Sequence, residues 1–148
     1  MRAGDLYHVG IVTDDLDGVR DEMSELLGYE WTQEVTARTA VCLLGVDTAL
    51  DLRLVYSRTT PRVELVASLP GNPVWTPAGG SGVHHLGYWS DDLAADRAEL
   101  EERGFVAEAL GQEPGGPAMW GYFAREGAPR IELVSRAMQE YMEQSWRA

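Results

Sequence analysis

Residues 84–93 read His84-His85-Leu86-Gly87-Tyr88-Trp89-Ser90-Asp91-Asp92-Leu93, and they repeat the pattern of an earlier stretch, Tyr7-His8-Val9-Gly10-Ile11-Val12-Thr13-Asp14-Asp15-Leu16. A second echo follows each of them, because Arg62-Val63-Glu64-Leu65-Val66 recurs as Arg130-Ile131-Glu132-Leu133-Val134. Self-similarity of this kind indicates a duplicated structural unit. The chain therefore consists of one module written twice, with a histidine near its start and a glutamate near its end.

Each copy follows the same order of elements. In the first copy, residues 5–12 alternate as in a buried strand, Asp14-Asp15 can cap a helix, and apolar residues recur at helical spacing from Leu16 until Gly28. Residues 29–38, 50–56 and 61–68 are rich in strand-forming residues, whereas the period of residues 40–49 is ambiguous. The first copy is therefore predicted to be βαβββ.

The second copy repeats this order. We expect a strand at 83–89, a helix at 92–103 that Gly104 ends, and strands near 105–109, 118–124 and 129–134. The apolar residues that follow fall on one face of a final helix, which covers either the sheet or a partner subunit. These elements predict an α+β fold built from two tandem βαβββ modules.

The length of the chain limits how the modules can be arranged. At 148 residues the chain fits one domain, and a half of about 70 residues buries too little surface to be stable by itself. Residues 70–82 are rich in proline and glycine and form the linker. We therefore predict a single domain over residues 1–148, made of a first module (1–69), the linker (70–82), a second module (83–135) and a C-terminal helix (136–148).

The composition excludes several classes of partner. A formal net charge of −12 repels phosphate backbones and anionic lipid surfaces, so neither nucleic acid nor a membrane is an expected partner. The single cysteine, Cys42, lies in an apolar run and cannot form an internal disulfide. The N-terminal residues lack the apolar core of a signal peptide, and no run of about 18 apolar residues is present. We expect a soluble, cytoplasmic protein.

A tandem βαβββ module with histidine on its first strand and glutamate on its last resembles the vicinal oxygen chelate (glyoxalase / bleomycin resistance / extradiol dioxygenase) superfamily. The likeness extends from about His8 to Val134. It is strongest toward the glyoxalase-like and methylmalonyl-CoA epimerase-like branch, in Val63-Glu64-Leu65-Val66, the linker and Gly82-Val83-His84-His85-Leu86-Gly87. The resemblance implies that the modules pair edge to edge into an open, U-shaped mixed β-sheet with flanking helices, and that the protein forms a homodimer.

Carried over to this sequence, the resemblance implies that His8, Glu64, His85 and Glu132 hold one divalent metal ion. The repeat alignment selects His85 as the ligand, because His8-Val9-Gly10 matches His85-Leu86-Gly87, and His84 should face away from the ion. Two imidazoles and two carboxylates suit Zn²⁺, Ni²⁺, Co²⁺, Fe²⁺ or Mn²⁺. Both glutamates stand between apolar neighbours, where a buried carboxylate needs a cation as its partner.

The implied chemistry is proton transfer beside a carbonyl. An octahedral ion with four protein ligands keeps two adjacent positions for two substrate oxygens, and it stabilises an enolate-like intermediate. The sequence therefore favours a metal-dependent glyoxalase-like enzyme, an isomerase, epimerase or lyase, that acts on a small carbonyl or acyl substrate. Glu132, with Glu64 as its counterpart, is the candidate catalytic base.

Two other functions stay open at this point. One is a non-catalytic small-molecule-binding protein of the antibiotic-sequestering type, which shares the fold but resembles cases that lack this ligand set. The other is an Fe²⁺ extradiol-type dioxygenase, whose pattern uses two histidines and one glutamate. Glu64 counts against the dioxygenase, because a fourth protein ligand occupies a position that oxygen needs.

Other residues near these motifs have weaker assignments. Trp89 shares a strand face with His85, and Trp120 and Tyr122 alternate with smaller neighbours, so all three are candidates for the wall of a pocket. Arg62 and Arg130 precede the two glutamates by two residues, and we expect them to pair with these glutamates or with an anionic group of the substrate, or, as the favoured role, to form surface ion pairs.

Overall fold

The computed structural model describes residues 1–148 and has an α+β architecture, as the sequence predicts. The first half contains β1 (Leu6–Thr13), α1 (Leu16–Leu27), β2 (Val35–Leu43), β3 (Val46–Tyr56) and β4 (Val63–Ala67). The second half contains β5 (His85–Ser90), α2 (Leu93–Glu102), β6 (Val106–Gly111), β7 (Trp120–Ala124) and β8 (Ile131–Ser135). Short 3-10 turns, η1 (Ala3–Asp5) and η2 (Arg136–Met138), precede β1 and the C-terminal helix α3 (Gln139–Arg147).

Local signals set the ends of the two module helices. The carboxylate of Asp15 accepts a hydrogen bond from the Gly18 amide, and Asp92 does the same for Ala95, each at 3.0 Å, so both helices begin at an N-cap aspartate. Gly28 has a φ of 72°, a conformation that ends α1 at low cost for a glycine. The paired Asp-Asp motifs of the repeat therefore serve to start α1 and α2.

The eight strands form a closed barrel in the order β1-β4-β3-β2-β6-β7-β8-β5, so the prediction of an open, U-shaped sheet is wrong. The halves meet along two seams, because β1 pairs with β5 and β2 pairs with β6. Residues 41–43 face residues 109–111 across the second seam. An open sheet would leave these backbone groups unpaired at its edges, and closure removes that cost.

The ambiguous residues 40–49 form a hairpin between β2 and β3. Leu44 and Gly45 occupy the turn with φ of 48° and 83°, and a two-residue turn with positive φ at both positions matches the twist of the flanking strands. The strand expected at residues 29–38 begins later, at Val35, and continues to Leu43. This extension carries β2 to the seam with β6.

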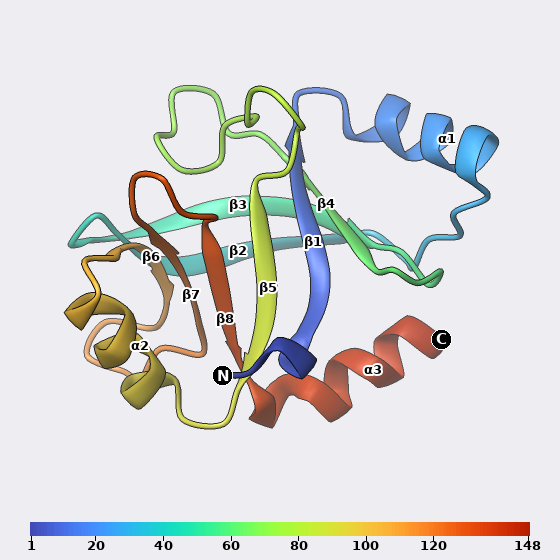
Figure 1. Cartoon of the computed structure of the whole chain (residues 1–148). Helices are drawn as coiled ribbons and strands as arrows, with labels where there is room; N and C mark the ends of the chain where they lie inside the picture. The colour runs from blue at the N-terminus through green and yellow to red at the C-terminus, as the bar shows by residue number, and fades with distance from the viewer.

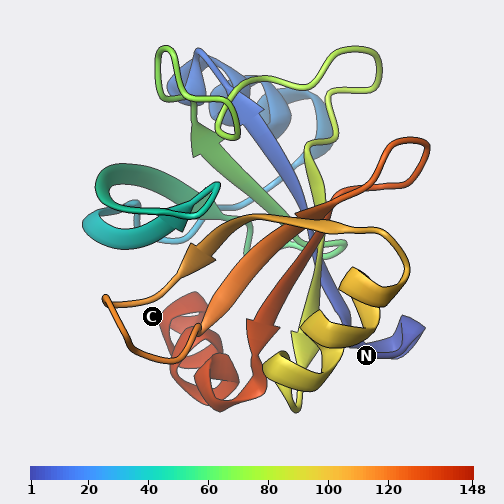
Figure 2. The ribbon, with the colours of Figure 1, turned by 90° about the vertical axis from the view of Figure 1, so that its left-hand side faces the viewer.

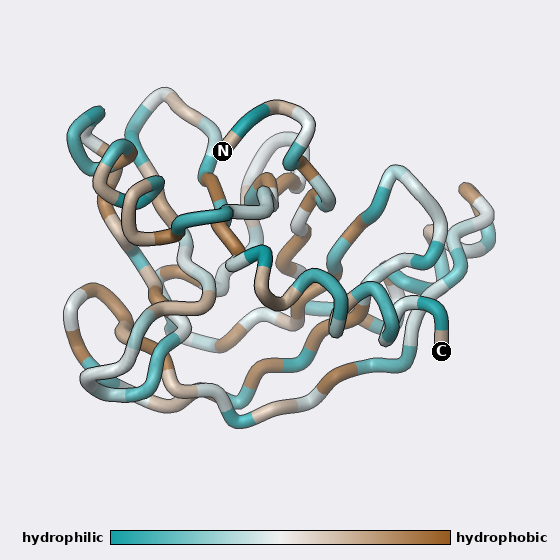
Figure 3. The backbone as a smooth tube through the Cα atoms, turned by 90° about the horizontal axis from the view of Figure 1, so that it is seen from below, coloured by the Kyte–Doolittle hydropathy of each residue, from teal (hydrophilic) through white to brown (hydrophobic).

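The helices differ in what they cover. α1 and α2 lie on the outside of the sheet on opposite sides, whereas α3 lies across one end of the barrel (Figures 1 and 2). Inside the barrel, one core cluster joins residues from six strands with two linker residues: Val12, Val41, Leu52, Val66, Ala109, Tyr122, Val74 and Trp75. Hydrophobic and hydrophilic residues alternate along the backbone, as expected for strands with a buried and a more exposed face (Figure 3).

The C-terminal helix and the linker, both expected from the sequence, pack against the barrel. The terminal helix covers the barrel of its own chain, because Trp146 is 8% exposed and packs with Trp89 and Val134. The linker also contributes to the core, because two of its residues, Val74 and Trp75, are buried. None of the helices has the length and hydrophobicity needed to cross a lipid bilayer. Homodimerisation stays a prediction.

Candidate metal centre

The four residues named from the repeat lie on four neighbouring strands, in the order β4-β1-β5-β8. Strand register fixes their positions symmetrically about the seam between β1 and β5. Gly10 of β1 is opposite both Glu64 and His85, and Gly87 of β5 is opposite both Glu132 and His8. Because side chains on neighbouring strands at matched positions point to the same face, all four enter the barrel at one level.

Each glycine of the repeated His-x-Gly motif makes room for the histidine of the other module. A Cβ atom added to Gly10 would lie 1.9 Å from Cε1 of His85, and one added to Gly87 would lie 1.9 Å from Cε1 of His8. No side chain larger than hydrogen fits at either position while the histidines keep their places. The repeated glycines are therefore required by close approach across the seam.

The ligand atoms of these residues converge. One nitrogen or oxygen from each of His8, Glu64, His85 and Glu132 lies within 4.8 Å of all the others. The two Nε2 atoms are 2.9 Å apart, and Oε2 of Glu64 lies 3.5 Å from Nε2 of His8 and 3.1 Å from Nε2 of His85. All four side chains are buried, with none of the residues more than 6% exposed.

The contacts of Glu132 show that these atoms point to a shared centre. Its Oε2 lies 2.9 Å from Nε2 of His8 and 3.2 Å from Nε2 of His85, yet it has no partner with hydrogen-bond geometry. Ligands bound at roughly 2.0–2.2 Å from one ion are separated from each other by about 3 Å, which is the spacing seen here. The donor set and its spacing thus fit a divalent metal ion.

The electrostatics of the cluster favour ionised carboxylates. Burial alone would raise the pKa of Glu64 and Glu132, but the close approach and positive charge of the His8 and His85 imidazoles lower both below the ordinary value of 4.5. Desolvation likewise opposes protonation of His8, yet the two glutamates outweigh it and raise the pKa of His8 to about 9. The buried carboxylates therefore require positive charge beside them, which protonated histidine or a metal ion can supply.

His84 turns away from the glutamates and contacts the far side of His85. Its Nε2 lies 2.7 Å from the carbonyl oxygen of Val74, which can only accept, so this nitrogen carries a proton. Burial lowers the pKa of His84 to about 4, so the ring is neutral and its Nδ1 accepts from Nδ1 of His85 at 2.9 Å. With its proton on Nδ1, neutral His85 presents the lone pair of Nε2 to the centre.

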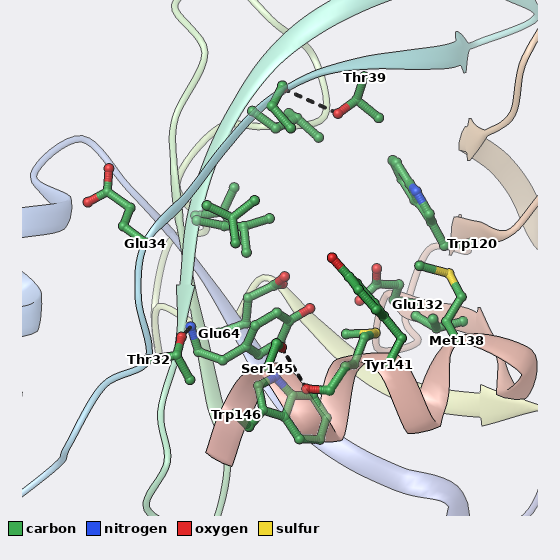
Figure 4. Close-up of a pocket in the computed structure, with 18 of the residues that line it drawn as sticks. Thr32, Glu34, Thr39, Glu64, Trp120, Glu132, Met138, Tyr141, Ser145 and Trp146 are labelled. Carbon is green, nitrogen blue, oxygen red and sulfur yellow. Dashed lines mark hydrogen bonds between the residues drawn. The ribbon is translucent and has the colours of Figure 1, made fainter. Parts of the chain in front are cut away.

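The cluster lies in the wall of a cavity of about 430 Å³. Sixteen of the 23 lining residues are hydrophobic, and Glu64 and Glu132 both line the cavity (Figure 4). One side is formed by β2 and β3, and another by the C-terminal segment, which contributes Met138, Tyr141, Met142, Ser145 and Trp146. A pocket with this volume and mostly apolar lining is typical of small-molecule sites.

Of the three aromatic residues that the sequence suggested for a pocket wall, two line the cavity and one does not. Trp120 and Tyr122 line the cavity, but Trp89 does not, because the ring of Tyr7 stacks on it at a centroid distance of 3.9 Å. Tyr7 lines the cavity, and its ring centroid lies 4.4 Å from that of His8, although strict alternation would put the two residues on opposite faces. A register shift between Leu6 and His8 accounts for this.

The arginines before the two glutamates have other partners. Arg62 stacks on the Trp146 ring at 3.9 Å and donates to the carbonyl of Ser57, whereas Arg130 pairs with Glu108 at 2.7 Å. Neither pairs with Glu64 or Glu132.

Some cavity residues had no assignment from the sequence. Tyr56 continues the alternating face of Leu52 and Leu54, so strand parity offered a signal for it. Trp75 is buried and lines the cavity. No sequence pattern indicated this, because it lies between prolines in the linker.

Comparisons with known proteins agree with this architecture. The chain aligns with the structure of methylmalonyl-CoA epimerase from Mycobacterium tuberculosis at 22% sequence identity and a TM-score of 0.62. The alignment covers 93% of this chain and 91% of the epimerase. A second similar structure is a single-residue variant of the Streptomyces coelicolor methylmalonyl-CoA epimerase in complex with 2-nitronate-propionyl-CoA. This alignment covers 90% of the present chain and 97% of the variant, at 20% identity and a TM-score of 0.60. A hypothetical protein from Bacillus halodurans has a TM-score of 0.61 at 13% identity, over 88% of this chain and 93% of that one.

Structural similarity at these low sequence identities shows that the chain shares the fold of these proteins. No curated protein matches the sequence. The model of one family matches residues 7–120, a stretch that includes His8, Glu64 and His85 and ends before Glu132. The chain therefore belongs to the glyoxalase/bleomycin resistance protein/dioxygenase superfamily.

Proposed function

We propose that this protein is a divalent-metal-dependent isomerase, epimerase or lyase that acts on a small carbonyl or acyl compound. The observation that carries the proposal is the buried cluster of two histidines and two glutamates in the wall of an apolar cavity. A cluster with solely structural duties would have no need of a cavity beside its carboxylates. His8, Glu64, His85 and Glu132 would hold the ion.

Such an ion supplies Lewis-acid stabilisation of the negative charge that develops on substrate oxygen when a proton leaves the neighbouring carbon. The chain's own residues prepare the site for this chemistry. His84 and the Val74 carbonyl fix the orientation of His85, and Gly10 and Gly87 let both imidazoles approach the centre. The mostly apolar lining lowers the local dielectric, which strengthens charge interactions within the cavity.

Glu132 is the proposed base, with Glu64 as its counterpart. Both carboxylates face the cavity, and both are held ionised by the neighbouring imidazoles, so either can accept a proton from a bound carbon acid. Oε2 of Glu132 has no partner with hydrogen-bond geometry, whereas Oε2 of Glu64 lies 3.1 Å from Nε2 of His85 in a geometry that becomes a hydrogen bond when this nitrogen is protonated. This difference favours Glu132 as the residue that moves the proton.

Metal analysis is the first test. Purified protein dialysed against Zn²⁺ or Co²⁺ should hold one ion per chain, and His85→Ala should abolish this binding. Glu108→Gln is the matched control, because Glu108 pairs with Arg130 outside the cluster. A protein that binds small molecules but no ion would refute the enzyme and support the binding-protein alternative.

Hydrogen exchange is the second test. The metal-loaded protein in D₂O should accelerate exchange of the C–H beside the carbonyl of a bound substrate, followed by NMR. Glu132→Gln should lose this exchange by at least about 100-fold, within the usual effect of removing a general base. Oxygen consumption with catechols would instead indicate the dioxygenase.

A further inference from the structure

We infer that the substrate is an uncharged, ring-containing carbonyl compound rather than a coenzyme A ester. The inference rests on the proposed function and narrows its substrate class. It depends on the charges of the cavity, on its aromatic lining and on two buried donors that have no partner.

The cavity offers no cationic side chain to a phosphate group. The sequence contains no lysine, and none of its 12 arginines lines the cavity. Phosphate groups are bound by arginine, lysine or clustered backbone amides. The net charge of −12 adds a repulsive field for any polyanion.

The arginines near the cavity are already engaged. Arg53 forms a bidentate pair with Glu34, which lies at the edge of the cavity in Figure 4. Arg62 stacks on Trp146, and Arg58 donates to the carbonyl of Ala148. A nucleotide tail leaving the cavity would therefore have to compete with existing partners for each guanidinium.

The lining suits a flat apolar ring. Tyr56, Trp120 and Tyr122 come from strands of the barrel and Trp75 from the linker. The helix α3 adds Tyr141 and Trp146. Aromatic side chains gain from offset or edge-to-face contact with another ring, by about 0.5–1.5 kcal/mol per pair beyond burial. A small aliphatic acyl group would leave most of this surface without contacts.

Two donors mark where an oxygen of the ligand belongs. The hydroxyl of Tyr7 and Nε1 of Trp146 are buried, belong to residues that line the same cavity, and have no hydrogen-bond partner. A buried donor without a partner costs about 1–3 kcal/mol. A carbonyl oxygen on an uncharged ligand satisfies such a donor without bringing a net charge into the apolar cavity.

The test compares two compounds on the metal-loaded full chain. One is 1-phenyl-1,2-propanedione, which is uncharged, aromatic and has two adjacent carbonyl oxygens, and the other is methylmalonyl-CoA. Binding is measured by calorimetry and by quenching of the cavity tryptophans. The diketone should bind at least tenfold more tightly. Tyr7→Phe should weaken it about three- to tenfold, the usual value of one hydrogen bond. Tyr29→Phe is the control, because the Tyr29 hydroxyl is satisfied by the Pro61 carbonyl outside the cavity.

Equal or tighter binding of methylmalonyl-CoA would overturn the inference, and so would a diketone affinity that Tyr7→Phe leaves unchanged. The metal content of the same samples separates this failure from that of the proposed function. A chain that holds one ion but does not bind the diketone refutes the substrate class alone. A chain that holds no ion refutes the proposed function.

Discussion

Replacing Gly87 by alanine should remove His8 from the proposed metal centre without unfolding the protein. The added Cβ would lie 1.9 Å from Cε1 of His8, whereas ordinary contact begins at 3.4 Å. The imidazole must therefore move by about 1.5 Å, while metal–ligand distances tolerate about 0.2 Å. We expect the Kd for Zn²⁺ or Co²⁺ to rise about 100-fold or more, beyond the 10–100-fold range known for loss of an outer-shell partner.

The assay for this variant is a competition titration against a chelator of known affinity, with the visible spectrum of bound Co²⁺ as a second readout. Urea unfolding measures the cost of the clash in the same samples, and overpacking of a buried site costs typically about 1–3 kcal/mol. Gly79→Ala is the matched control, because a Cβ there meets nothing within 4 Å. Gly10→Ala should repeat the effect through His85.

Two results would refute the reasoning. If the Gly87→Ala variant folds and binds metal with the affinity of the parent, His8 is not a ligand in the position described. If Gly79→Ala weakens metal binding as much as Gly87→Ala, the effect belongs to the loss of any glycine rather than to the clash.

Three further predictions concern the surroundings of the centre. His84→Phe should weaken metal binding about tenfold in the same titration, because it removes the group that orients a ligand. In the metal-free protein, desolvation is outweighed by the two buried glutamates, which raise the pKa of His8 from 6.5 to about 9. The resulting stabilisation is complete below pH 6.5 and is lost as the pH rises through 9, so the free energy of unfolding in urea should fall over this range, and less steeply in His8→Gln. Arg62→Gln should lower that free energy by about 1 kcal/mol through loss of the contact with Trp146, whereas Arg97→Gln, an exposed pair, should change it by less than about 0.5 kcal/mol.

The order of elements could be predicted from the sequence because its signals are local. Asp15 and Asp92 start the two helices and Gly28 ends the first, and each acts through atoms within a few residues of itself. The cluster of four could be predicted for a different reason. Duplication placed the same residue types at matched strand positions, so a pattern within one chain carried information about contacts across the barrel.

Other features depend on contacts between segments far apart in the sequence. Closure of the barrel requires residues 41–43 to meet residues 109–111, and no local pattern in either segment specifies this partner. The place of Tyr7 depends on a one-position shift in the register of β1 against β5. The burial of Trp75 depends on the cavity that the linker crosses, because the composition around it indicates a loop.

The reciprocal glycines link the proposed metal binding to the pairing of the two halves. Each half supplies one histidine and one glutamate, and it supplies the space for the histidine of the other half. A shift of one residue in the pairing of β1 with β5 would turn His8 or His85 out of the barrel and place a larger side chain where a glycine is needed. An ion bound by all four residues therefore stabilises a single register of this seam. A ligand that binds only the folded state adds its binding free energy to the stability of that state. Removal of the ion should therefore destabilise the seam between β1 and β5 more than the hairpin between β2 and β3, which contributes no ligand.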